Sequence, residues 1–342
     1  MGLKEKKDYL LATKEGIRQS IVSHGVTLPR GSTFRSYMDK VATLPTAKID
    51  DCSYFFYKGK RMEQFEEIND KVLTHAKNMS YLFYETEFEQ YEELPAKLNT
   101  QNCEDFTSAF ENCHRYCYVP ELDLSNCKSL KRAFYGVNWL GHESDFNSIP
   151  VWDTSNVEDM SYLFYDCLYA LFRRNEGKFP KFNMQNVLDA KYMCYKCWNL
   201  ITVPELNTAK CKDFSYTFYN CDKLVTVESI DMASCTDATN MFYNCLALES
   251  VVLKNTEVLA TTTGMFTGCG ALKLLVFGST KVPSFSIANC AFDRDGMVAL
   301  FDSLPDGGTS TITITGNPCV TDGTLTDSDK AIATSKGYTL TV

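Results

Sequence analysis

The sequence of 342 residues has few of the catalytic side chains typical of enzymes and none of the long apolar runs typical of membrane proteins. It has four histidines and three tryptophans, and no uninterrupted apolar run approaches the roughly 18 residues of a membrane span. None of the histidines lies in an H-E-x-x-H frame or beside a cysteine-nucleophile motif, and glycine-rich phosphate loops are absent. We therefore expect a protein that is not an enzyme, uses no cofactor and does not insert into a membrane.

Positive charge is also scarce. The net charge is −9, and the stretch 1–48, with nine Lys/Arg and four Asp/Glu, is locally basic in an otherwise acidic chain. An acidic surface argues against nucleic acid and anionic membranes as partners. The start, at Met1–Lys7, lacks the apolar core of a signal peptide, so we expect folding in a reducing cytoplasm.

What the sequence has in abundance is one repeated string of eight residues, called the octet here and best seen at Met160–Cys167. We number each octet from its central aromatic residue as position 0, and copies recur at short, nearly regular intervals along the chain. A period of roughly 20–50 residues predicts a solenoid of stacked units, each burying its apolar side against its neighbours. Position 0 is occupied by Phe56, Phe83, Phe110, Phe134, Phe164, Cys194, Phe218, Phe242 and Phe266.

The octet and the residues after it predict two kinds of element. Positions −4, −1, 0 and +3 are mostly apolar, which is the stripe of one or two helical turns. The short apolar runs at 200–206 and 224–230 suit brief strands of a parallel sheet. One strand and one short helical or 3₁₀ segment in each repeat predict an α/β fold, namely a leucine-rich-repeat solenoid.

Fifteen cysteines first suggest a disulfide framework or a metal site. Most of them fall into two octet columns, at positions +3 and −7, and other octets have Val, Leu or Ala at position −7. Free cysteine behaves as a small hydrophobe, so we favour buried thiols over oxidised or metal-bound cysteine. Cys113, His114 and Cys117 supply at most three zinc ligands, and no fourth lies nearby.

Tyrosines recur at positions −2 and +1. At 100° per residue these positions lie opposite the apolar stripe, and at 120° they coincide on one face away from it, so we expect them to point outward. Two interpretations remain open: a stacking ladder that only packs, or a contact surface for proteins or sugars. The candidate binding residues are Tyr162, Tyr165, Tyr192, Tyr195, Tyr216, Tyr219 and Tyr243.

The two ends of the chain lack the period. Residues 1–46 are expected to form an N-terminal helical attachment domain: one helix with an apolar side at Leu3–His24, and a short one that ends before Pro45. Residues 47–292 form the solenoid of about nine repeats.

Residues 293–342 are expected to cap the solenoid. The pattern predicts a helix at Asp293–Leu304, a strand at Thr311–Thr315, a helix that Thr326 begins and Gly337 ends, and a last strand to Val342. A strand, a helix and a strand at nearly the repeat spacing would continue the sheet and close its open end.

The stretch Val151–Phe164, V-W-D-T-S-N-V-E-D-M-S-Y-L-F, resembles the W-D-T-S-N-V-x-D-M-S-x-M-F motif of BspA-like leucine-rich repeats. The octet ending F-Y-x-C and the downstream L-x-x-V-P-E-L at 200–206 resemble the same family. The departures are longer repeats around 136–149 and 172–178, which we expect to bulge as loops, and Cys194 in place of an aromatic residue.

The runs Thr13–Arg18 and Gly25–Val41 resemble a leader of bacteriophage tail and virion proteins, and the C-terminal segment resembles the closing part of phage-encoded repeat proteins. This resemblance implies a receptor-binding protein of the virion tail, folded in the host cytoplasm. Its N-terminal helices would bind other tail proteins, and its repeats would bind a host surface protein or polysaccharide. The alternative is a secreted or cell-surface bacterial adhesin, as many BspA-like proteins are thought to be.

Overall fold

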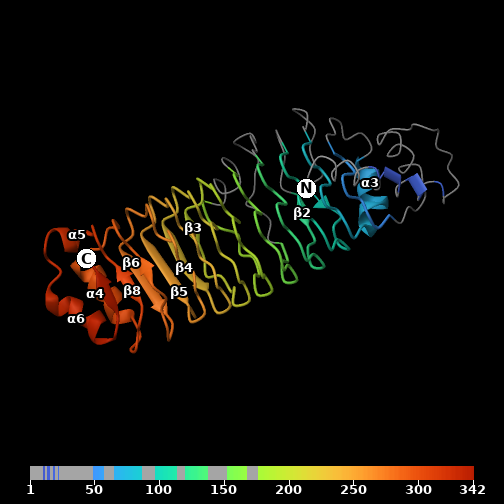
Figure 1. Cartoon of the computed structure of the whole chain (residues 1–342). Coiled ribbons are helices and arrows are strands. Elements are labelled where there is room, and N and C mark those ends of the chain that lie inside the picture. Colours follow the sequence, from blue (N-terminus) through green and yellow to red (C-terminus); the bar gives the residue numbers. More distant parts are fainter. Residues whose placement is uncertain are drawn as a thin grey trace. The chain divides into compact units, whose positions relative to one another are not determined.

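Figure 1 shows the fold of the chain in a computed structural model. The structure describes residues 49–57, 65–86, 97–113, 120–137, 152–167 and 176–342, preceded by Leu11, Lys14, Glu15, Arg18, Gln19 and Val22. The chain forms two compact units, residues 1–157 and 158–342. In each unit, successive circuits of chain lie parallel and are joined through short strands and bridges. Each unit is therefore a parallel β-solenoid, which confirms the expected repeat solenoid.

The described elements of the first unit are few and short. Helix α3 (Phe65–Lys71) leads into the 3₁₀ turn η1 (Leu73–His75), and strands β1 (Lys97–Leu98) and β2 (Glu121–Leu122) pair in parallel. A second line of contact runs through position −5 of the octets. There, isolated parallel bridges join, one after another, Asp51, Asn78, Asp105 and Ser129.

The second unit contains a four-stranded parallel sheet in the order β3 (Thr202–Val203), β4 (Thr226–Asp231), β5 (Ser250–Lys254) and β6 (Leu274–Gly278). The strands lie side by side in Figure 1. Their pairing advances by one period per circuit, with Val251 between Val227 and Leu275. Side chains alternate along β5, where Val251 and Leu253 are buried and their neighbours are half-exposed. The strands expected at 200–206 and 224–230 are thus confirmed.

The C-terminal part of the chain, from Phe285 onward, contains a second parallel sheet with three helices. Strand β7 (Phe285–Ser286) pairs with β8 (Thr311–Thr313), which pairs with β9 (Thr339–Thr341). Helix α4 (Arg294–Ser303) packs on β6, and α5 (Pro318–Thr321) and α6 (Asp327–Ser335) follow. The expected strands and the helices α4 and α6 are confirmed, whereas α5 was not expected.

Both long helices begin as the sequence predicts. The Asp293 side chain accepts a hydrogen bond from the Gly296 backbone N–H at 2.8 Å. Thr326 and Asp329 form a reciprocal capping box at the start of α6, which satisfies two N–H groups that the helix leaves unpaired. Gly337, with φ of 97°, follows the C-cap of α6 and lets the chain turn into β9.

The octets are not helical, which corrects the expectation drawn from their apolar spacing. Backbone N–H groups at positions −4, −2, 0 and +2 donate to the next circuit, as Tyr162 N does to Lys191 O at 2.9 Å. Those at −1, +1 and +3 donate three residues back, as Tyr165 N does to Tyr162 O at 3.1 Å. Positions −2 and +2 have positive φ, 59° at Tyr162 and 58° at Asp166, which no right-handed helix contains. Each octet is a series of tight turns stacked on the next.

The apolar stripe is buried even though its backbone is not helical. Met160, Leu163 and Phe164 have no exposed surface, and Cys167 is 3% exposed. The rings at position 0 stack from circuit to circuit, with centroids 5.0 Å apart for Phe56 and Phe83 and 5.5 Å for Phe218 and Phe242. These stacks run through the core and add to the burial of each ring.

The described cysteines are all buried and free of disulfides. Most thiols at position +3 donate to the carbonyl at position 0 of the preceding circuit, as Cys221 does to Cys194 O at 3.1 Å and Cys245 to Phe218 O at 3.0 Å. Burial raises the pKa of both thiols, so they stay protonated at neutral pH. The expected buried thiols are confirmed for the described residues.

Several predictions lie wholly or partly outside the described residues. This is the case for most of residues 1–46, for His114 and Cys117, and for the main part of both expected loops. Leu11 and Val22 lie in helical segments and are 56% and 45% exposed. Within the described part of the chain, no helix has the length and apolarity needed to cross a bilayer.

Candidate functional site

The tyrosines at positions −2 and +1 of the second unit form two adjoining stacks, called the tyrosine ladder here. Successive rings in one stack have centroids 4.4–4.8 Å apart and planes within 10° of parallel. The spacing equals that of neighbouring strands, because each ring is carried by its own circuit. Rings of the two stacks contact each other obliquely, at 5.6–6.2 Å. The ladder comprises Tyr162, Tyr192 and Tyr216 at position −2, and Tyr165, Tyr195, Tyr219 and Tyr243 at position +1.

An unusual backbone angle accompanies the arrangement. Tyr192 and Tyr216 have φ of 55° and 57°, in the left-handed region that bulky side chains rarely occupy. Such a conformation persists only where the surrounding structure holds it. Here the hydrogen bond from Tyr192 N to Ser215 O in the next circuit, the bond from Tyr195 N to Tyr192 O within the octet, and the stacked rings supply that restraint.

The seven ladder tyrosines are half-buried rather than freely exposed. Rings inside the stacks, such as Tyr192 and Tyr195, have both faces against neighbouring rings, so their edges and hydroxyl groups are what reaches the solvent. The first unit departs further from the outward orientation that the sequence predicts. Tyr54 and Tyr84 are only 2% and 5% exposed there, so that prediction is wrong for these two residues.

Five ladder hydroxyls have no hydrogen-bond partner among the described residues, and none of the five is a buried atom. A phenol hydroxyl both donates and accepts a hydrogen bond, so these groups are available to a ligand. Desolvation, together with Tyr216 and Tyr162, raises the pKa of Tyr192 to about 12, so it is uncharged at neutral pH. We call the five groups the hydroxyl rows: Tyr192, Tyr195, Tyr216, Tyr219 and Tyr243.

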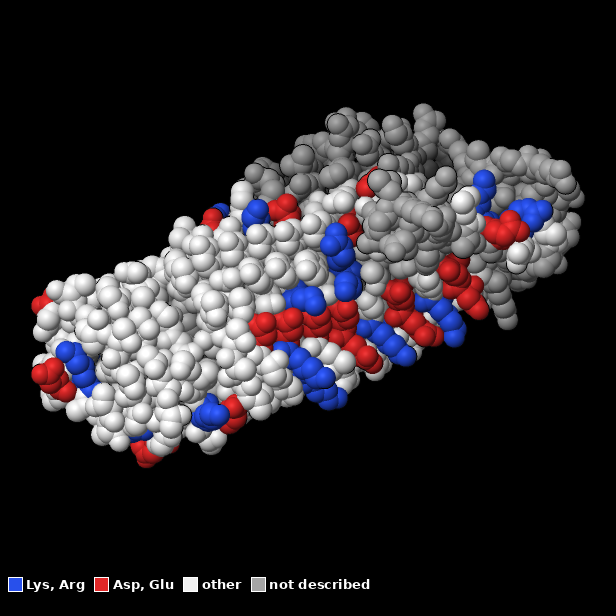
Figure 2. Space-filling view, in the orientation of Figure 1, with Lys and Arg blue, Asp and Glu red and all other residues white. Residues whose placement is uncertain are grey.

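A column of carboxylates accompanies the ladder at position −5. Parallel bridges join these residues, and each side chain accepts a hydrogen bond of 2.8–3.0 Å from the N–H at position −3. That bond holds the chain where it enters each octet. The charge of Asp213 contributes to the raised pKa of Tyr192, so the column borders the ladder. Figure 2 shows a stripe of acidic side chains on one face. The column comprises Asp159, Asp189, Asp213 and Asp237.

In the first unit the same columns, at positions −2 and +1, hold a short tyrosine stack, with Tyr54 on Tyr81 at 4.5 Å, followed by an ion pair. Glu111, at position +1, accepts from Nε and Nη2 of Arg132, at position −2 of the next octet, at 2.9 and 2.7 Å. The guanidinium carbon lies 3.9 Å from the centroid of the Tyr135 ring. The same columns therefore hold either stacked phenols or a paired charge, and the long ladder is a property of the second unit.

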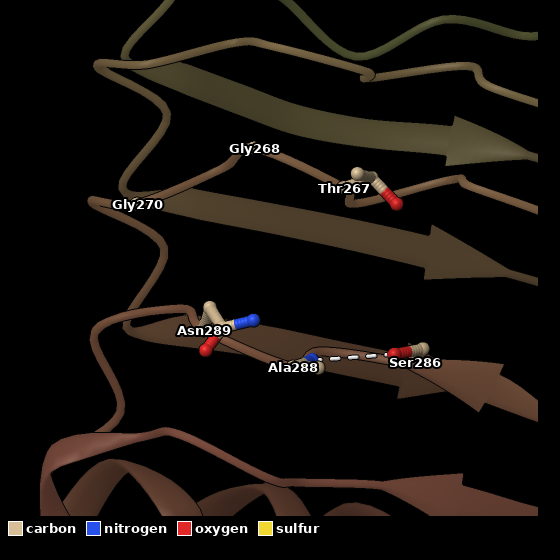
Figure 3. A pocket seen from close by; sticks show the side chains of 6 residues that line it. All are labelled: Thr267, Gly268, Gly270, Ser286, Ala288 and Asn289. Atoms are coloured by element: carbon tan, nitrogen blue, oxygen red, sulfur yellow. Dashed lines mark hydrogen bonds between the residues drawn. The ribbon is translucent and has the colours of Figure 1, made fainter.

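A small hollow lies next to the last octet (Figure 3). It has a volume of about 200 Å³, and Thr267 occupies position +1 there, the position that Tyr243 occupies one circuit earlier. Its lining offers hydroxyl, amide and backbone groups but no titratable side chain. Gly268, with φ of 80°, is required because a Cβ there would lie 2.2 Å from Asn244 Oδ1. The lining residues are Thr267, Gly268, Gly270, Ser286, Ala288 and Asn289.

Metal ligands do not converge in the described part of the chain. No group of three or more His, Cys, Asp or Glu there is placed to hold a metal ion. The Cys113 thiol donates to Phe83 O at 2.9 Å, within the same column of structural thiols as Cys221 and Cys245.

The two units and their octets define a repeat protein of the parallel β-solenoid class. The chain belongs to the family described as "Mycoplasma protein of unknown function, DUF285", which matches residues 32–126, 77–200 and 168–275. No curated protein and no solved structure matches the chain.

The turn geometry of the octet had a signal that periodicity alone misses. Asn240 and Gly264 occupy position −2, and Asn244 and Gly268 occupy position +2. Glycine and asparagine are the residues that adopt left-handed backbone most readily. Their recurrence at two fixed positions indicates turns rather than a helix.

Proposed function

We propose that the protein is a non-enzymatic binding protein and that the tyrosine ladder is its contact surface. The observation that carries this proposal is the pair of hydroxyl rows. Stacking needs only the rings, since the buried stacks at position 0 are made of phenylalanine, which has no hydroxyl. The hydroxyl rows instead present regularly spaced hydroxyls without a partner among the described residues, beside large amphipathic rings of the kind enriched at interfaces.

We propose that this surface serves a bacteriophage tail. The support is the resemblance of residues 13–41 and of the C-terminal segment to phage proteins, and the partners would be other tail proteins and a host-cell receptor. The solenoid would then be of the leucine-rich-repeat type, with residues 293–342 as its cap. Mass spectrometry of purified virions tests this location, and absence of the protein from the particles would refute it. Surface labelling of intact bacteria would reveal the protein if it is instead an adhesin.

The contact surface itself is tested by binding of the full chain to intact bacterial cells. A variant with serine at Tyr165, Tyr195, Tyr219 and Tyr243 is expected to lose at least tenfold in affinity. The matched control carries serine at Val258 and Leu274, two exposed apolar residues that lie outside the ladder. Equal binding by the ladder variant and the wild type would show that the tyrosines only pack and do not form the contact surface.

A further inference from the structure

The geometry of the ladder limits the kind of ligand that it can recognise. The rings of Tyr195 and Tyr219 have centroids 4.8 Å apart and planes 10° from parallel, so nothing fits between them. Binding through an aromatic face, whether to a cation or to a flat ring, requires that face to be open. The interior of the ladder therefore offers ring edges and hydroxyls, and recognition depends on hydrogen bonds.

The charge around the ladder excludes a further class of ligand. The Tyr192 hydroxyl is uncharged at neutral pH, and the carboxylates at position −5 border the ladder. Lys191 pairs with Asp189 at 3.0 Å, and Lys196 Nζ lies 5.5 Å from the centroid of the Tyr195 ring. These two cations compensate part of the negative charge of the four carboxylates. A polyanion would meet repulsion along the column, whereas an uncharged ligand meets neither repulsion nor a demand for counter-charge.

The spacing of the rungs distinguishes an extended peptide from a sugar polymer. We call each tyrosine ring of a stack a rung. A β-strand rises about 3.3 Å per residue, and this rise does not match the 4.4–4.8 Å between the centroids of successive rungs. A polysaccharide carries several hydroxyls on each residue, each of them a donor and an acceptor. Such a chain can form a hydrogen bond at every rung, and it can do so in many positions along the ladder.

We propose that the hydroxyl rows bind an uncharged polysaccharide lying along the ladder, held by hydrogen bonds to the phenols and by contacts with ring edges. This inference rests on the proposed binding function and names its ligand class. Each contact is weak, because a phenol exchanges one hydrogen bond to water for one to the ligand. Affinity therefore grows with the number of rungs that the ligand spans.

The test measures binding of the full chain to immobilised dextran, mannan and amylose, with alginate as an anionic polymer and polylysine as a cationic one. We expect binding to at least one of the neutral polymers, and weaker binding to its short oligomers. Phenylalanine at all five positions of the hydroxyl rows preserves the stacks and is expected to weaken binding at least tenfold. The control variant, Thr334→Val with Ser335→Ala, removes two exposed hydroxyls on α6 and is expected to bind like the wild type.

Three results would overturn the inference: no binding to any neutral polymer, preference for alginate or polylysine, or undiminished binding by the phenylalanine variant. A parallel assay on intact bacteria separates the two proposals. Cell binding that survives periodate oxidation of surface sugars would refute a polysaccharide ligand and leave a protein receptor. Absence of cell binding by the wild type would refute the proposed function itself.

Discussion

A left-handed backbone angle at position −2 places two tyrosines, three residues apart, on the same surface. At Tyr192 this angle is 55°, whereas Tyr195, three residues later, has an ordinary negative φ. Each residue stacks on two neighbouring rings, Tyr192 between Tyr162 and Tyr216, and Tyr195 between Tyr165 and Tyr219. The two positions therefore form a matched pair that differs in backbone conformation.

We expect the glycine and alanine variants to differ in stability in opposite directions at Tyr192 and at Tyr195. At Tyr192, glycine should be more stable than alanine by about 1 kcal/mol, because an L-residue is strained at positive φ. At Tyr195, alanine should be more stable by roughly 0.5–1 kcal/mol, because glycine loses more backbone entropy. Urea unfolding of the four variants measures both differences, and the same order at both positions would contradict the assigned turn geometry.

The column of thiols is a second feature of single residues that can be measured. Cys221 and Cys245 are fully buried, and burial raises the pKa of each. Since the thiolate is the reactive form, both should alkylate far more slowly in the folded protein at pH 8 than in urea. Mass spectrometry after brief iodoacetamide treatment checks this, with the urea-unfolded chain as the control. Labelling of folded protein at the unfolded rate would show that the column is not in the core.

At the scale of the element, an ion pair ties α4 to α6. Asp329 accepts from Nη2 and Nε of Arg294 at 2.8 and 2.9 Å and from the Thr326 N–H at 2.9 Å. These hydrogen bonds, with that from Arg294 the largest contribution, hold the pKa of Asp329 at about 2. The stabilisation is therefore complete above the unfolded pKa of about 3.9 and is lost as the pH falls through 2.

The contribution of the Arg294–Asp329 pair to stability can be measured by acid unfolding. Between pH 4 and pH 2 the wild type should lose more stability than Asp329→Asn, which has no carboxyl to protonate there. Asp327→Asn is the control, because that side chain is fully exposed. Circular dichroism over this pH range measures the difference, and parallel curves for wild type and Asp329→Asn would contradict the assignment.

The elements could be predicted from the sequence where local chemistry decides them. The caps at Asp293 and Thr326 and the apolar runs of β3 and β4 indicate where these elements begin. The octet is different, because stacked turns bury positions −4, −1, 0 and +3 just as a helix would. Its decisive hydrogen bonds join residues a whole circuit apart, as Tyr162 to Lys191, which a local pattern does not reveal.

For the candidate site, the sequence predicts which tyrosines take part but not how they are arranged. Repetition identifies the tyrosine columns, but not the face-to-face stacking that closes their ring faces. Nor does it identify the burial of Tyr54 and Tyr84, which depends on how neighbouring circuits pack. The unpartnered hydroxyls follow from the full set of surrounding atoms and so appear only in the structure.

At the scale of the whole molecule, the solenoid is expected to tolerate loss of one complete period. In the second unit, deletion of the segment 222–245 removes one whole period and leaves every column in register, as in the pairing of Val227 with Val251. The shortened protein should fold cooperatively, with an m-value reduced in proportion to its smaller buried surface. Deletion of the segment 222–239 is the control, since it removes only part of a period and shifts the columns out of register. Equal cooperativity of both deletions would contradict the register.

The central proposal is that the octets of the ladder have two sides with separable roles: a buried stripe that holds the fold, and tyrosines that would bind a ligand through their hydroxyls. One variant tests both halves, phenylalanine at Tyr192, Tyr195, Tyr216, Tyr219 and Tyr243. Because these hydroxyls have no protein partner, the free energy of unfolding should change by less than about 0.5 kcal/mol per site. Affinity for intact bacteria should fall at least tenfold. Strong destabilisation with unchanged binding would contradict the account.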